Sequence, residues 1–158
     1  MPERFHWIVP GKLAAMALPG LAVPLKDDLA DIEKRGVRAV ATFTERPLPE
    51  AGRASSSLEF VHIPIDDFDI PTLDQVRQFC AWADARIAEE KPVAVHCFAG
   101  LGRTGLMIAC FLVREPGRTT DKLLYELRKI EPGYVQTAQQ ETIIAVWESE
   151  LRHAGKKT

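Results

Sequence analysis

Short apolar segments that alternate with longer segments of helical periodicity are the feature that most constrains the fold of this chain. A short apolar run bounded by turn residues is typical of a buried strand, whereas apolar residues spaced three and four positions apart indicate a helix. Strands come first along the chain and then alternate with helices. This order predicts an α/β fold with a twisted, mostly parallel sheet of about five strands flanked by helices. Strands are expected at residues 5–9, 14–18, 37–44, 58–65 and 92–96, and helices at residues 24–35, 72–87, 106–113, 120–130 and 137–151, with a polar loop at 45–57 and an acidic loop at 66–71.

The size and charge of the chain limit what it can be. Its 158 residues are enough to bury a hydrophobic core without disulfide or metal staples. We therefore expect a single domain over residues 1–158, with a core from about residue 5 to about residue 151, and we expect a monomer. Lys and Arg number 20 and Asp and Glu number 22, which gives a net charge of −2. Because this balance provides no general attraction to nucleic acid or to a membrane surface, any anion must be bound locally.

The three cysteines, Cys80, Cys97 and Cys110, are an odd and widely spaced set. They form no secreted disulfide framework and lack the spacing of a zinc site, so we expect no metal, no other cofactor and a reducing, cytoplasmic setting. Residues 13–25 are nearly all apolar, but prolines interrupt this region, and we do not interpret it as a signal peptide. No apolar run approaches the ~18 residues that a membrane span requires.

The most informative segment is residues 95–105, Val-His-Cys-Phe-Ala-Gly-Leu-Gly-Arg-Thr-Gly, where an expected strand turns into an expected helix. Glycine and small residues let such a loop curl, so that successive backbone N–H groups converge on one point. The helix N-terminus adds a partial positive charge there, and Arg103 can bind two phosphate oxygens. Cys97 would lie at the floor of this cradle, where the same field favours its thiolate as a nucleophile. The predicted phosphate-binding loop consists of Phe98, Ala99, Gly100, Leu101, Gly102 and Arg103.

Two other phosphate-binding motifs fit this segment poorly. Gly100, Gly102 and Gly105 match the glycine pattern of a dinucleotide-binding turn. That motif requires an acidic residue about 20 positions further on, at the end of a second strand. The nearest candidate, Asp121, begins an expected helix. The nucleotide-binding P-loop requires a lysine, and the segment has none.

His96-Cys97, followed by five residues and Arg103-Thr104-Gly105, resembles the signature of the protein tyrosine phosphatase superfamily. Residues 5–14 and the short segments Thr44-Glu-Arg, Asp67-Phe68 and Asp74-Gln75 are similar to small, domain-only atypical dual-specificity phosphatases, the VHZ-like group. The similarity extends from about residue 5 to about residue 147. It implies the phosphatase fold and a cysteine-dependent phosphoric monoester hydrolase.

The resemblance implies that Cys97 attacks phosphorus to form a phosphocysteine intermediate, and that Arg103 binds the phosphate and stabilises the transition state. Thr104 is expected either to donate its hydroxyl to the Cys97 thiolate or to satisfy a backbone group. His96 is expected to order the loop through hydrogen bonds to the backbone. A direct acid or base role for His96 is not expected, because its side chain should point to the opposite side of the strand from that of Cys97.

The leaving oxygen needs a proton, so a carboxylic acid should lie over the cradle. The acidic loop offers Asp66, Asp67 and Asp69. In the family that the chain resembles, the acid lies about 30 residues before the cysteine and is followed by phenylalanine, and Asp67 stands 30 positions before Cys97. The resemblance therefore favours Asp67, while Asp66 and Asp69 stay open as alternatives.

Gln140 aligns with a glutamine that, in relatives, helps to hold the water for hydrolysis of the phosphocysteine. Its position three residues after Thr137 equally fits a helix capping box, and both roles stay open. Cys80 and Cys110 fall on apolar helix faces, where we expect core residues.

We expect metal-independent hydrolysis of phosphotyrosine in phosphoprotein or phosphopeptide substrates. Phosphoserine and phosphothreonine should react more weakly, because a phenolate is the better leaving group. The loop contains no lysine, and relatives that act on inositol lipids often carry basic residues there. The alternatives are a phosphatase for RNA 5′-triphosphate or a phosphoinositide, and a phosphate-binding module without turnover. Cys97, Arg103 and Asp67 together argue against the last, since a pure binder needs no acid.

Overall fold

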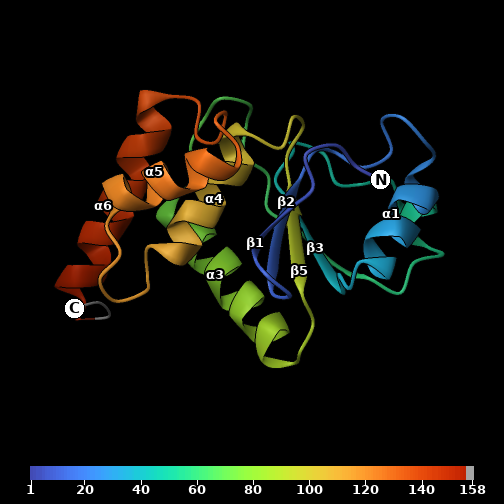
Figure 1. The fold of residues 1–158 in the computed structure, drawn as a ribbon, viewed down its shortest axis with the longest axis horizontal. Coiled ribbons are helices and arrows are strands. Elements are labelled where there is room, and N and C mark those ends of the chain that lie inside the picture. The colour runs from blue at the N-terminus through green and yellow to red at the C-terminus, as the bar shows by residue number, and fades with distance from the viewer. Residues whose placement is uncertain (156–158) are drawn as a thin grey trace.

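A five-stranded sheet forms the centre of the structure (Figure 1). The structure is a computed structural model and describes residues 1–155. The strands lie in the order β1-β2-β5-β3-β4, with β1 and β2 antiparallel and every other neighbouring pair parallel. This arrangement confirms the predicted α/β fold with a mostly parallel sheet. The strands are β1 (His6–Val9), β2 (Leu13–Met16), β3 (Ala39–Thr42), β4 (Glu59–His62) and β5 (Val93–His96).

Helices cover both faces of the sheet, with α3 to α6 on one side and α1 on the other (Figure 1). Successive residues of β2 alternate between the two resulting cores, because side chains of a strand point to opposite faces in turn. Leu13 and Ala15 join the larger core beneath α3 to α6, and Ala14 and Met16 join the smaller core beneath α1. The helices are α1 (Leu25–Lys34), α2 (Glu50–Arg53), α3 (Leu73–Ala88), α4 (Gly102–Leu112), α5 (Thr120–Ile130) and α6 (Ala138–His153). Within residues 1–155, every helix is too short or too polar to cross a membrane.

The element bounds differ from the sequence expectation in two places that matter. Residues 45–57, expected to be a loop, contain the single-turn helix α2, which begins directly after Pro49 because proline suits the start of a helix. The helix expected from residue 106 begins at Gly102. The four additional residues are two glycines and two polar residues whose pattern carries no apolar periodicity, but all four are buried.

The central strand β5 leads into the loop that contains Cys97 and fixes where that loop begins. Every residue of β5 is buried, and the strand pairs with β2 on one side and β3 on the other. Helix α4 follows directly and is itself surrounded, with the side chains of Leu106, Met107 and Ile108 fully buried. The loop between β5 and α4 is therefore held between two elements that are buried in the core.

Gly100 lets this loop pass close to the backbone at the end of β2. Its φ of +76° lies in the left-handed region that favours glycine. A Cβ atom on Gly100 would lie 2.5 Å from Met16 O and 2.7 Å from Ala17 N. The backbone of β2 thus sets the path of the loop.

Replacing Gly100 with alanine should destabilise the fold more than the same change at Gly117. Both glycines have nearly the same φ, +76° and +79°, so the cost of a left-handed alanine is shared. Only Gly100→Ala creates a backbone clash, since nothing lies within 4 Å of a Cβ at Gly117. We expect an additional loss of about 1–3 kcal/mol in the free energy of unfolding, measured by urea denaturation. Equal losses for the two variants would contradict the close packing of Gly100 on β2.

Candidate active site

The backbone N–H groups of the loop after β5 lack acceptors within the described part of the chain. Among residues 1–155, the N–H groups of residues 98–103 donate to no protein acceptor. In contrast, the carbonyl groups of Phe98, Ala99 and Leu101 have partners outside the loop. Phe98 O accepts from Leu18 N at 2.9 Å, and Leu101 O accepts from Gly105 N at 2.9 Å and Val135 N at 3.3 Å. Since a trans peptide directs its C=O and N–H in opposite directions, this pattern leaves a set of unpaired donors on the side of the loop away from the bonded carbonyls, an arrangement typical of anion-binding loops.

The guanidinium of Arg103 is fixed by groups from the segments that follow two different strands, β3 and β4. Its side chain is only 3% exposed. Nη1 donates to Ile65 O at 2.8 Å and to a carboxylate oxygen of Glu45, and Nη2 lies 3.2 Å from Asp67 Oδ1. The Nε donor is buried without a hydrogen-bond partner. Because a buried, unpaired donor is costly, its presence beside the unpaired loop N–H groups is consistent with an oxyanion site.

Asp67 is the acidic-loop residue that lies beside Arg103. Its side chain is half exposed, and its Oδ1 also accepts from Phe68 N at 3.0 Å. Phe68 has a φ of +60°, a conformation that is uncommon outside glycine and that often marks functional segments. Asp69 instead accepts from Ile70 N at 2.8 Å, and Asp66 makes no ion pair within the described part of the chain. The structure thus brings Asp67, rather than its two alternatives, to the arginine.

Cys97 lies at the end of β5 with its side chain buried, being 2% exposed. The other two thiols are also buried, which confirms them as core residues. Burial raises the pKa of Cys80 to about 12, against a smaller opposing effect of the Arg114 charge. Burial likewise raises the pKa of Cys110 well above its usual value. Neither Cys80 nor Cys110 therefore supplies a thiolate at neutral pH.

His96 is a neutral, fully buried support of the loop. Its Nδ1 lies 2.9 Å from Cys97 O and its Nε2 lies 2.8 Å from Thr42 Oγ1. A carbonyl can only accept, so Nδ1 carries the proton and Nε2 accepts from the threonine hydroxyl. Burial lowers the pKa of His96 to about 4, against the opposing effect of the hydrogen bond to Cys97. His96 thus links the ends of β3 and β5 without carrying charge.

The expected hydrogen bond from Thr104 is absent. The Thr104 hydroxyl is buried and has no hydrogen-bond partner within residues 1–155. Neither expected bond, to the Cys97 sulfur or to a backbone group, is therefore present in the structure. Helix α4 begins earlier than expected and includes Thr104 in its first turn.

Gln140 connects three segments around the loop. It forms the capping box of α6 with Thr137, so the capping alternative is present in the structure. Its Oε1 accepts from Gln136 N at 2.8 Å, and its Nε2 donates to Asp69 O at 3.3 Å. A Cβ atom on Gly102 would lie 3.2 Å from the Gln140 amide. Gln140 thus joins the acidic loop to the start of α6 by hydrogen bonds and lies close to the start of α4.

Sequence reasoning assigned no role to Glu45, although the segment that contains it formed part of the resemblance. The structure shows its carboxylate bonded to Arg103 from the loop after β3. A buried arginine requires a carboxylate or carbonyl partner, and this rule was the available signal. It could not select Glu45 from among the 22 acidic residues.

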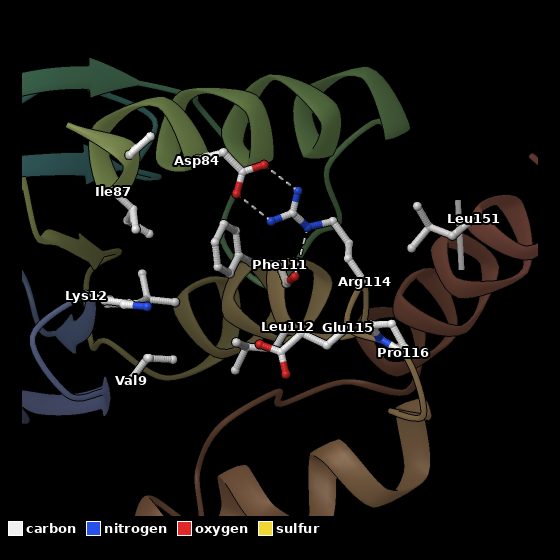
Figure 2. A pocket seen from close by; sticks show the side chains of 12 residues that line it. Val9, Lys12, Asp84, Ile87, Phe111, Leu112, Arg114, Glu115, Pro116 and Leu151 are labelled. Carbon is white, nitrogen blue, oxygen red and sulfur yellow. Dashed lines mark hydrogen bonds and ion pairs between the residues drawn. The ribbon is translucent and has the colours of Figure 1, made fainter. Parts of the chain in front are cut away.

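A pocket of about 490 Å³ opens beside Arg103 and Asp67. Its wall is mainly apolar and includes Phe98, Leu18 and Leu48. A larger pocket of about 680 Å³ lies elsewhere, at the other end of α4 (Figure 2). There Arg114 binds both carboxylate oxygens of Asp84, at 2.7 and 2.8 Å (Figure 2).

The larger pocket contains none of the predicted site residues. Its bidentate arginine–carboxylate pair leaves little unpaired donor capacity for an anion. We therefore place the candidate site in the smaller pocket despite the difference in volume. Within residues 1–155, no group of three or more His, Cys, Asp or Glu side chains is arranged to hold a metal ion.

Comparison with known proteins points in one direction. A family model described as "Polymorphic toxin system, DSP-PTPase phosphatase" matches residues 14–117. The tyrosine-protein phosphatase CDC14 of Saccharomyces cerevisiae is 36% identical over 117 residues, which are 74% of this chain and 21% of that protein. CDC14 of Candida albicans is 31% identical over 121 residues, 77% of this chain and 22% of that protein. The chain thus spans about a fifth of the length of these curated relatives.

A solved structure, that of Tk-PTP in the active form, superimposes with a TM-score of 0.82 at 28% identity. The match covers 94% of this chain and 99% of that one. The likeness therefore includes all layers of the fold and the elements that carry the candidate site.

Acidification should destabilise the protein through His96. Its pKa is about 4 when folded and about 6.5 when unfolded, so the unfolded state binds the proton more readily. The contribution of neutral His96 to the free energy of unfolding is fully present above pH 6.5 and is lost as the pH falls toward 4. Between pH 7.5 and pH 5 we expect the free energy of unfolding of the wild-type protein, measured by urea denaturation, to fall by about 2 kcal/mol more than that of the variant His96→Asn.

Since carboxylates elsewhere titrate equally in both proteins, the difference between them isolates His96. If His96→Asn does not fold, the ring signals of His96 in the wild-type protein give the same information by NMR. Protonation of His96 near pH 6.5 in the folded protein would contradict the prediction.

Proposed function

Since the chain belongs to the dual-specificity and tyrosine phosphatase (DSP-PTPase) family, we propose that it hydrolyses phosphotyrosine in proteins through a phosphocysteine intermediate on Cys97. Phosphoserine and phosphothreonine are weaker substrates in this proposal. The observation that carries it is the set of unpaired N–H groups between Cys97 and the buried, carboxylate-fixed Arg103. This arrangement provides a nucleophile, an oxyanion site and a proton donor in one place.

In the first step, the Cys97 sulfur attacks phosphorus in line with the leaving oxygen. The S–P bond forms as the bond from phosphorus to the leaving oxygen breaks. Arg103 and the loop N–H groups stabilise the negative charge on the three remaining oxygens. Asp67 in its protonated form, released from the ion pair that its Oδ1 makes with Arg103 Nη2 at 3.2 Å, gives its proton to the leaving oxygen.

In the second step, water attacks the phosphocysteine. The Asp67 carboxylate takes a proton from the water, the S–P bond breaks, and inorganic phosphate and the Cys97 thiolate are released. Gln140 supports this step by holding the acidic loop through Asp69 O. A direct role in positioning the water requires its Nε2 to leave that carbonyl, and the capping bonds of its Oε1 can persist meanwhile.

The pocket beside Arg103 supports an aromatic leaving group. Apolar side chains and prolines dominate its wall, which suits a phenyl ring more than a sugar or an inositol. Phe98, at the rim, is 55% exposed and offers a surface on which an aromatic ring can stack. The alternatives, a phosphatase for RNA 5′-triphosphate or a phosphoinositide, would gain little from such a wall. A binding module without turnover would not need Asp67.

The remaining expectations form part of the same proposal. We propose that residues 1–158 act as one catalytic domain, as a monomer and in the cytoplasm. Three free cysteines, one of them the proposed nucleophile, suit a reducing compartment.

The variant Cys97→Ser should abolish phosphate release from phosphotyrosine peptides in the presence of a chelator, because serine is not a thiolate nucleophile. The wild-type protein should release phosphate from these peptides faster than from phosphoserine peptides, a phosphoinositide or RNA 5′-triphosphate. Circular dichroism controls for folding. Undiminished turnover by Cys97→Ser would exclude the mechanism, and preferential release from the phosphoinositide or the RNA would favour those alternatives.

Asp67→Asn should lower kcat by about 10²–10⁴-fold, because asparagine cannot donate the proton to the leaving oxygen. The loss should be smaller for substrates whose leaving group needs no proton. Asp66→Asn is the matched control, since it makes the same change one position earlier and should retain activity. A larger loss for Asp66→Asn than for Asp67→Asn would show that the acid has been assigned to the wrong residue.

A further inference from the structure

The first residues of the chain lie against the predicted phosphate-binding loop. Glu3 O accepts from Ala17 N at 2.8 Å, and the next residue along, Leu18, donates its N–H to Phe98 O at 2.9 Å. Phe5 is anchored below, where its ring meets that of Trp7 edge-on at 5.6 Å. The N-terminal segment, the end of β2 and the loop are thus joined by successive backbone hydrogen bonds.

Arg4 extends from this anchored segment onto the loop itself. Its Nη1 donates to Ala99 O at 3.2 Å, across 95 positions of sequence. Its backbone φ of +52° lies in the left-handed region, which is unfavourable for arginine. Such a conformation persists only where the surrounding structure imposes it. Here the bonded Glu3 carbonyl and the buried Pro2 hold the segment on the preceding side.

Ala99 O differs from the other bonded carbonyls of the loop. Those of Cys97, Phe98 and Leu101 accept from neutral groups, a histidine ring or backbone N–H groups. Ala99 O accepts from a cationic side chain that is 39% exposed. Fixing this oxygen toward Arg4 directs the next N–H, that of Gly100, away from Arg4, because C=O and N–H of a trans peptide point in opposite directions.

We propose that Arg4 is a positioning residue that holds the Ala99–Gly100 peptide with its N–H toward the bound phosphate. The proposal rests on the proposed function, since it assumes that the loop binds a phosphate. The charge of Arg4 is partly balanced by Glu3, whose Oε2 lies 3.8 Å from the same Nη1, so the hydrogen bond to Ala99 O is the main contribution of Arg4. Arg4 precedes residue 14, where the match to the phosphatase family begins, so Arg4 lies outside the matched segment, whereas its partner Ala99 lies inside it.

The test is the affinity for inorganic phosphate of proteins that carry Cys97→Ser, measured by titration calorimetry. Adding Arg4→Met should weaken phosphate binding about five- to tenfold, the value of one hydrogen bond and a nearby charge. Adding Arg4→Lys should restore most of the affinity, because lysine can donate to the same carbonyl. With Cys97 present, Arg4→Met should lower kcat/KM by a similar factor and leave the basic limb of the pH profile unchanged, since the proton donor Asp67 is intact.

Arg35→Met is the matched control. Arg35 lies 5.2 Å from the ring of Phe5 and so contacts the same N-terminal segment, but it does not reach the loop. The protein with Arg35→Met should bind phosphate as tightly as the parent that carries only Cys97→Ser. If Arg4→Met binds phosphate as tightly as the parent, or if Arg35→Met and Arg4→Lys weaken binding as much as Arg4→Met, the positioning role is excluded.

The same titration separates this inference from the proposed function. If the parent with Cys97→Ser binds no phosphate, the proposed function fails and the role of Arg4 fails with it. If the parent binds phosphate and only the Arg4 comparison fails, the proposed function stands.

Discussion

The burial of one guanidinium is the constraint on which the rest of the structure depends. Arg103 lies at the start of α4 with almost no exposure to solvent, and a charge placed there must be paired or the fold loses several kcal/mol. Its partners are Glu45, Ile65 O and Asp67, which belong to the segments that follow β3 and β4. Pairing Arg103 therefore brings the ends of three parallel strands together at one edge of the sheet. A crevice at the carboxyl ends of parallel strands is where α/β folds place their ligands.

The site attracts anions through local geometry and not through net charge. The chain carries two more acidic than basic residues, and the carboxylates beside Arg103 reduce its field further. What remains is a ring of backbone donors, a helix N-terminus and the single unpaired Nε of Arg103. Because these groups are fixed before a ligand arrives, they need no reorganisation when charge develops on a transferred phosphoryl group. Neutral His96, bonded to the Cys97 carbonyl, supports the loop without adding a charge that would change with pH.

The candidate site lies in the smaller of the two pockets, because the pairing of polar groups, and not the volume, distinguishes them. The larger pocket lies at the far end of α4, where Arg114 and Asp84 satisfy each other (Figure 2). The smaller pocket lies where donors lack acceptors. Unpaired buried donors are costly to a folded protein, and the unpaired Nε of Arg103 beside a set of unpaired backbone N–H groups marks a functional site more specifically than empty volume does.

Sequence alone determined the α/β class, the mostly parallel sheet and the strand–loop–helix segment from His96 to Thr104, because periodicity and glycine spacing are local properties of the chain. It also placed the caps of α3 and α6, since capping pairs lie three residues apart. Only the tertiary structure decided that Glu45, 58 positions from Arg103, is its partner, and that Asp67 is the acidic-loop residue that approaches it. It likewise decided that α4 begins at Gly102 and leaves the Thr104 hydroxyl unpaired. The physical reason is that these choices depend on where separate strands end relative to one another, which the packing of the sheet against its helices sets and which no local pattern records.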